Sequence, residues 1–147
     1  MADAEGVPDG AADTVLCRSC PVHPDPSARL AAVRRLPEAL LPIAMTDPEP
    51  EIRRDVARRI AADWLAVMAW DDDSGVRLIV ASRLQPEQLI ALAGDSDPRV
   101  RAEVATRVVP SALVKLAEDG AEEVCRVARL RLSGLIHQGP EGEHRLM

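Results

Sequence analysis

The sequence predicts an all-α protein, a solenoid of about five 24-residue repeats, and three observations support this prediction. Residue types recur with a period of 24 along most of the 147-residue chain. Within each period, apolar residues follow the spacing i, i+4, i+8, which marks one face of a helix. No segment alternates apolar and polar residues or is rich in β-branched and aromatic residues, so we expect no sheet.

The period of 24 is seen in charged positions as clearly as in apolar ones. We call a set of residues spaced 24 positions apart a column. One column consists of leucines: Leu41, Leu65, Leu89 and Leu113. The charged columns are Arg29, Arg53, Arg77 and Arg101; Arg35, Arg59, Arg83, Arg107 and Arg131; and Asp47, Asp71, Asp95 and Asp119. Because apolar and charged columns keep one phase, we interpret the whole segment 25–137 as a single repeat array.

Each repeat is expected to contain a helix of roughly ten residues and then a shorter helical turn. The spacing predicts the longer helix over 52–60, 76–84 and 100–108, and the shorter turn over 65–69, 89–93 and 113–117. Asp97 followed by Pro98 is a typical helix start, and Asp73 holds the equivalent position one repeat earlier. Pro86 and Pro110 separate the two helical pieces. One repeat is too small to bury its own apolar stripe, so neighbours must stack.

The ends of the array differ from its middle, as terminal repeats usually do. The first repeat, about 25–48, has Ala28 and Ala32 where later repeats have Ile or Val. The last repeat, from about 121, has Cys125 in an arginine column. Residues 1–16 and 138–147 are polar with Gly or Pro, and we expect them to be disordered tails. Residues 17–24 form a separate cysteine-containing segment.

The repeat unit resembles that of the leucine-rich repeat variant family. Residues Asp95–Val108 read D-S-D-P-R-V-R-A-E-V-A-T-R-V, which is similar to the motif of that family's 24-residue unit. The resemblance covers residues 25 to about 133. It implies a right-handed superhelix of alternating α- and 3₁₀-helices.

Composition narrows the classes of partner. The net charge is −6 and the chain has no Phe, no Tyr and two Trp. A negative charge disfavours nucleic acid and anionic membranes, and aromatic platforms for base stacking are nearly absent. No apolar run is long enough to span a membrane. We therefore expect no nucleic acid or membrane partner. The odd cysteine count, including one Cys-x-x-Cys pair, is typical of a reducing compartment, so we expect a cytoplasmic protein.

The cysteine pair is the candidate metal site. Cys17 and Cys20 enclose two residues, and Pro21 and His23 follow closely. Two thiolates at this spacing can hold one metal ion or one face of a cluster, and proline often follows cluster-binding cysteines. Some proteins of the resembled family carry an N-terminal [4Fe-4S] segment and are encoded among nitrogen-fixation genes. The resemblance therefore implies an iron–sulfur site at Cys17 and Cys20.

Two thiolates do not complete a four-ligand site, which leaves several alternatives. Two chains could share one cluster and form a homodimer, or His23 could be a third ligand with a partner or a small molecule supplying the fourth. The pair could bind Zn instead, or hold no metal at all. Cys125 lies four repeats further along the array and is not expected to join this site.

The arginine columns and the two tryptophans have competing interpretations. The arginine stems can cover the core while their guanidinium groups reach the aspartate column or helix-end carbonyls, or they can line a groove for an acidic partner. Trp64 and Trp70 occupy columns that are otherwise variable, which suggests an anchor for another protein or a second copy. The alternative is packing against the N-terminal segment.

No arrangement typical of a catalytic site is present in the sequence. His23, His137 and His144 are scattered, and there is no Gly-rich phosphate loop or nucleophile motif. We therefore expect a non-enzymatic protein-binding scaffold with an iron–sulfur site, acting as an accessory protein of nitrogen fixation. The alternative is a cofactor-free or Zn-capped interaction solenoid.

Overall fold

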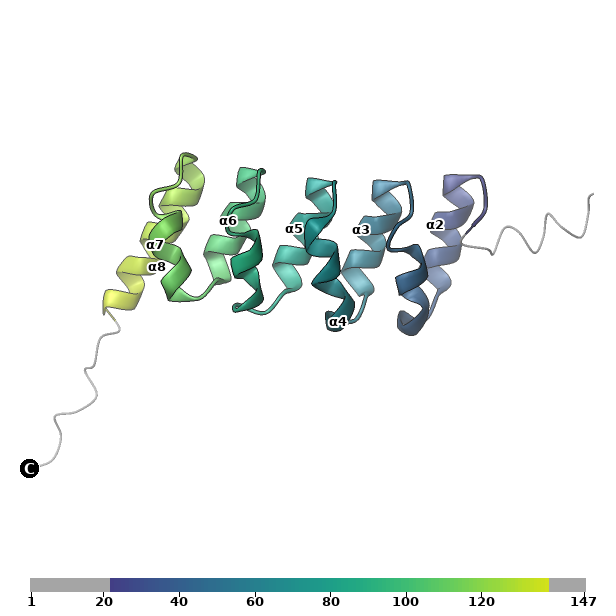
Figure 1. Ribbon diagram of the computed structural model, residues 1–147, viewed down its shortest axis with the longest axis horizontal. Coiled ribbons are helices and arrows are strands. Elements are labelled where there is room, and N and C mark those ends of the chain that lie inside the picture. The colour runs from purple at the N-terminus through teal and green to yellow at the C-terminus, as the bar shows by residue number, and fades with distance from the viewer. Residues whose placement is uncertain (1–21, 138–147) are drawn as a thin grey trace, which may run out of the picture. The chain divides into compact units, whose positions relative to one another are not determined.

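A computed structural model describes residues 22–137 of the chain, and every regular element in this range is a helix. The expectation of an all-α protein is confirmed over these residues (Figure 1). The chain divides between Ala61 and Ala62 into two compact units. We name the described segments the N-terminal unit (22–61) and the C-terminal unit (62–137). Both expected tails, and with them His144, lie outside the described residues.

The longer helices begin every 24 residues, as the repeat predicts. Their bounds are Pro26–Arg35 for α2, Pro50–Arg59 for α3, Ser74–Arg83 for α5, Pro98–Arg107 for α6 and Glu122–His137 for α8. The first four have 10 residues each, whereas α8 has 16. No proline follows Leu132 in α8, and the helix continues to His137.

Aspartate and proline start the longer helices. The side chains of Asp25, Asp73 and Asp97 accept hydrogen bonds from first-turn backbone N–H groups of α2, α5 and α6. Proline occupies the first turn of α2, α3 and α6, where its missing N–H costs no hydrogen bond. The helix start predicted from Asp97 and Pro98 is confirmed.

The ten-residue helices end without glycine. Each is followed by an apolar residue in extended conformation, and these residues are Leu36, Ile60, Leu84 and Val108. The last three are buried. The extended residue therefore both ends the helix and fills the core, and the chain turns directly into the shorter helix.

The shorter helices are less uniform than the resemblance implies. Their bounds are Glu38–Ala44 for η1, Ala62–Leu65 for α4, Val67–Trp70 for η2, Gln88–Leu92 for η3 and Pro110–Leu116 for α7. The three η elements are 3₁₀-helices as expected, but α4 and α7 are α-helical. Pro42 inside η1 has no N–H for an α-helical bond, whereas α7 carries proline only in its first turn, so the α-helical geometry is unobstructed there.

In the N-terminal unit, α2 and η1 both pack against α3. Val33, Leu41, Val56 and Ile60 are fully buried there. The first repeat has small residues where later repeats have Ile or Val, but Val33 replaces the alanine found at this column in the next three repeats. This substitution returns apolar volume to an otherwise alanine-rich terminal helix.

In the C-terminal unit, the longer helices follow one another as layers (Figure 1). Helix α5 packs against α6, and α6 packs against α8. The shorter helices η2, η3 and α7 pack against α5, α6 and α8 respectively. Ala81 and Ala105 are fully buried, and their small side chains let neighbouring helices approach closely.

We expect Leu89→Ala to lower the free energy of unfolding by about 2–5 kcal/mol, because Leu89 is 0% exposed and its loss leaves a cavity. Ile90→Ala is the matched control, because Ile90 is 52% exposed and removes little buried area. Chemical denaturation of both variants measures the difference. Equal losses would contradict the assignment of Leu89 to the core and Ile90 to the surface.

Candidate functional site

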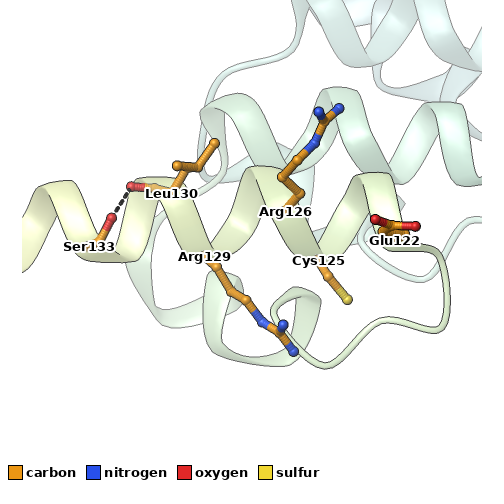
Figure 2. Close-up of a pocket in the computed structure, with 6 residues that line it drawn as sticks. All are labelled: Glu122, Cys125, Arg126, Arg129, Leu130 and Ser133. Atoms are coloured by element: carbon orange, nitrogen blue, oxygen red, sulfur yellow. Dashed lines mark hydrogen bonds between the residues drawn. The ribbon is translucent and has the colours of Figure 1, made fainter.

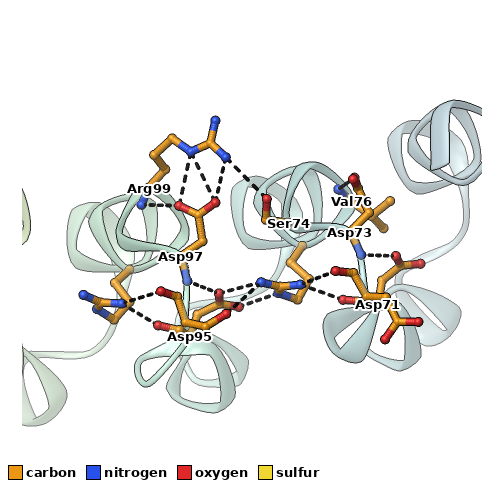
Figure 3. Close-up of polar contacts among 11 residues, drawn as sticks. Asp71, Asp73, Ser74, Val76, Asp95, Asp97 and Arg99 are labelled. Carbon is orange, nitrogen blue, oxygen red and sulfur yellow. Dashed lines mark hydrogen bonds and ion pairs between the residues drawn. The ribbon is translucent and has the colours of Figure 1, made fainter.

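One arginine column joins neighbouring repeats. In the C-terminal unit, Nε and Nη2 of Arg77 donate to the carboxylate of Asp95 over 2.7 and 2.9 Å. Nη1 of the same guanidinium donates to the carbonyl of Asp71 over 2.8 Å. Figure 3 shows this chain of contacts running from Asp71 to Asp95. A single side chain thus connects the loop before its own helix to the loop that follows 18 residues later.

The same arrangement recurs wherever both partners lie in one unit. Arg101 donates to the Asp119 carboxylate over 2.7 and 2.9 Å and to the Asp95 carbonyl over 2.6 Å. In the N-terminal unit Arg29 pairs with Asp47 over 2.9 and 3.1 Å. Each carboxylate receives two parallel N–H bonds, a geometry that arginine offers and lysine does not.

Each aspartate of this column also shapes its own loop. Oδ1 of Asp95 accepts the backbone N–H of Asp97 over 2.8 Å. The equivalent bonds join Asp47 to Glu49, Asp71 to Asp73 and Asp119 to Ala121. At Asp47, Asp95 and Asp119 the carboxylate therefore fixes the turn that precedes the next long helix while it holds the arginine 18 residues earlier in the same unit.

The electrostatics favour the ionised form of these carboxyl groups. Burial by itself would raise the pKa of Asp95, but hydrogen bonds from Arg77 and from the Asp97 N–H outweigh it, so the pKa of Asp95 lies below its ordinary value. The hydrogen bond from Arg101 is the leading cause of a lowered pKa at Asp119. The partner arginines have raised pKa values for the same reason.

The second arginine column caps the preceding helix. Arg107 donates to the carbonyls of Ala81, Ser82 and Leu84 at the end of α5. Arg131 does the same for Ala105 and Val108 at the end of α6. Helix-end carbonyls lack intrahelical partners, so these arginines satisfy them in place of a glycine cap. Within the units, both columns are occupied by structural contacts, which supports the structural interpretation over an arginine-lined groove.

In the last repeat, Cys125 occupies the position that follows Arg101 in the first arginine column. Its Sγ donates to the carbonyl of Asp119, the contact that an arginine makes in earlier repeats. Cys125 lines a hollow of about 570 Å³ along α8. The residues that line the hollow all lie on α8 and are drawn in Figure 2: Glu122, Cys125, Arg126, Arg129, Leu130 and Ser133. The lining combines three charged side chains with the exposed apolar side chain of Leu130.

Exposed apolar side chains gather on the shorter helices. In the C-terminal unit these are Trp64, Val67, Trp70, Ile90 and Val114, and we name this set the short-helix surface. Trp64 is 47% exposed and Trp70 is 75% exposed. By contrast, α2, α3, α5 and α6 have no exposed large apolar side chain, whereas α8 exposes Leu130 and Leu135. The two tryptophans singled out in the sequence therefore belong to a wider set of exposed apolar side chains on the shorter helices.

Beside Trp70 lies a hollow of about 390 Å³. Its walls come from the end of η2, the end of η3 and the loops that follow each of them: Ala69, Trp70, Asp71, Asp72, Arg77, Ala91, Leu92, Gly94, Asp95 and Ser96. Gly94 holds the column of Trp70 one repeat later, and it leaves the space beside the indole open.

The candidate metal ligands fall mostly outside the described residues. Cys17 and Cys20 are not described, and residues 22–137 contain no group of three or more His, Cys, Asp or Glu side chains placed to hold a metal. Nδ1 of His23 accepts the backbone N–H of Asp25 over 3.0 Å. In a neutral imidazole the proton is then on Nε2, so His23 would have to change tautomer or release Asp25 to bind a metal.

Together, the periodic helices and their arginine links define a helical-repeat protein. A solved structure titled a leucine-rich repeat variant with a novel repetitive protein structural motif matches with a TM-score of 0.72 and 32% identity over 76% of this chain. The chain therefore has a leucine-rich-repeat-variant fold, and it spans about half, 48%, of that chain. No family model matches, and no curated protein is significantly similar.

Across the described helices, none combines the length and the apolar character that crossing a membrane would require.

Sequence reasoning missed Val67, Ile90 and Val114 as members of the surface. Ile90 and Val114 each follow directly after a leucine of the core column, at a position turned away from the core. The sequence did contain a signal for these surface positions. On so short a helix, an apolar residue one position after a core leucine points away from the core.

We expect Arg101→Ala to lower the free energy of unfolding by about 2–4 kcal/mol, because it leaves the mostly buried Asp119 carboxylate without its charged partner. Arg99→Ala is the matched control, since Arg99 is exposed and pairs with Asp97 on its own turn. That exposed pair contributes about 1 kcal/mol or less. Denaturant melts compare the two variants, and a larger loss in Arg99→Ala would refute the structural role of the column.

Proposed function

We propose that the chain is a non-enzymatic scaffold that binds another protein through the short-helix surface. The observation that carries this proposal is that exposed large apolar side chains lie on the shorter helices and are absent from the ten-residue helices. The ten-residue helices contribute none, while the shorter helices of the C-terminal unit present five, including both tryptophans. Clustered exposed apolar groups on a stable fold are typical of interaction sites.

The two tryptophans are the proposed anchors. Tryptophan buries a large apolar area on binding and is enriched among residues that dominate binding energy. Trp70 has most of its surface available for a partner, and Trp64 about half. The exposed portions of the two indoles do not contribute to the packing of neighbouring repeats. A requirement for folding therefore does not by itself explain why tryptophan occupies these two positions.

We expect a photo-crosslinking amino acid at position 90, which lies on the short-helix surface and leaves both tryptophan anchors in place, to form an adduct with a partner protein in cells. The same amino acid at Ser82, an exposed position on α5, is the matched control and should give none. Mass spectrometry of the adducts identifies the partner, and an adduct with the chain itself would indicate self-association. Adducts of equal yield at both positions, or none at position 90, would refute the proposed surface.

A second proposal concerns the cysteine pair. We propose that Cys17 and Cys20 hold an iron–sulfur cluster, with Zn as the alternative metal. The Cys-x-x-Cys-Pro sequence and its place directly before the repeats support this proposal. The chemistry of the donor set fits a shared [4Fe-4S] cluster in a homodimer, because two chains would supply four thiolates. His23 is the less suitable third ligand, because its Nδ1 already accepts the Asp25 N–H.

We expect protein purified without oxygen to contain about two iron atoms per chain and to absorb near 400 nm. Cys20→Ala should lose both the iron and the absorption, and Cys125→Ala, the matched cysteine control, should keep them. Elemental analysis for iron, sulfide and zinc makes the measurement, and the mass of the native assembly tests the shared cluster. Colourless protein without metal would rule out both metal proposals and leave the scaffold proposal intact.

The resemblance also leads us to propose an accessory role in nitrogen fixation. Neighbouring genes for nitrogenase components would support that role, and their absence would weaken it without affecting the scaffold proposal.

A further inference from the structure

The hollow beside Trp70 differs from the rest of the short-helix surface because it joins an aromatic face to acidic groups. Its lining carries three carboxyl groups, Asp71, Asp72 and Asp95, and one guanidinium, Arg77. Arg77 is already bound to Asp95 over 2.7 and 2.9 Å. The Asp72 side chain is exposed at the rim.

The exposed charges around the wider surface are mostly acidic. Four exposed acidic residues lie on or directly beside the shorter helices of the C-terminal unit, and two exposed basic residues oppose them: Lys115 on α7, and Arg129, which donates to the Ala117 carbonyl at the end of α7. The acidic residues are Asp63, Asp72, Glu87 and Glu118. An apolar surface with an acidic rim is complementary to a partner segment that carries basic side chains.

From this arrangement we infer that the hollow beside Trp70 receives an arginine side chain of the bound protein. The planar guanidinium stacks on the indole face of Trp70, and its N–H groups donate to the Asp72 carboxylate. The apolar stem of the arginine lies over Ala91 and the open space at Gly94. This inference rests on the proposed scaffold function and names the chemistry of the partner.

The packing of the loops keeps the hollow open. The bidentate Arg77–Asp95 contact fixes the loop that contains Gly94 and Ser96 against the loop that contains Asp72. A Cβ added at Gly94 would meet no heavy atom within 4 Å, and the glycine backbone has no conformation that disfavours other residues. A larger side chain can therefore fill the hollow without disturbing the fold.

The chain offers a direct optical test because it has two tryptophans and no tyrosine. Trp64→Phe leaves Trp70 as the sole indole, and its emission reports on the hollow. We expect a hexa-arginine peptide to change this emission in a saturable way, hexa-lysine to bind more weakly, and hexa-glutamate to have no effect. Binding should weaken as salt rises, because exposed charges are screened.

Two variants in the Trp64→Phe background test the contacts. Asp72→Asn should weaken hexa-arginine binding about two- to fivefold, the range expected for an exposed charge pair. Glu123→Gln, which removes the same charge from an exposed position on α8, should leave it unchanged. Gly94→Leu should abolish the emission change while thermal melting stays as in the parent.

The inference is overturned if Glu123→Gln weakens binding as much as Asp72→Asn, because attraction to net charge would then explain it. Equal binding of hexa-lysine, or retained binding in Gly94→Leu, would also overturn it. Crosslinking at position 90 separates the two proposals. Adducts in cells without hexa-arginine binding would refute the partner chemistry and keep the scaffold function, whereas loss of both would refute the scaffold function as well.

Discussion

The bidentate contact between an arginine and the aspartate 18 residues later is the interaction on which the repeat stacking depends. One guanidinium holds the carbonyl before its own helix and the carboxylate before the next helix, so it fixes two loops at once. The aspartate in turn orders its own turn through a backbone N–H. Because the groups are ionised and mostly buried, losing either partner would leave an uncompensated charge. This coupling explains why both residue types recur in strict phase.

A core without Phe or Tyr imposes a second constraint. Branched aliphatic residues and alanine fill the space between layers, and the buried alanine column keeps the long helices close. Helices α2, α5 and α6 are each used by this packing, by an arginine link at the start and by carbonyl contacts at the end. The ten-residue helices therefore have little apolar surface left for a partner, whereas α8 exposes Leu130 and Leu135. The shorter helices carry outward apolar residues such as Ile90 directly beside core residues such as Leu89.

The end of the array follows the same rules with a different residue. Cys125 keeps the contact to the Asp119 carbonyl that an arginine makes in earlier repeats, but a thiol cannot extend to a further carboxylate. At the other end Val33 replaces the small residue of the middle repeats and restores packing. The function proposed for the chain thus depends on features added to the repeat: the tryptophans, the acidic rim and the Cys17–Cys20 segment.

The sequence by itself determined the all-α class, the 24-residue period and the starts of α5 and α6. These are local properties, because an Asp–Pro cap and an i, i+4, i+8 stripe act within one turn or one helix. It also indicated that Trp64 and Trp70 lie off the core columns. Only the tertiary structure decided which partner each arginine binds and that Trp70, Asp72 and Gly94 border one hollow. Those outcomes arise between residues about 18 to 26 positions apart, and a one-dimensional pattern does not contain the direction in which a side chain crosses to the next layer.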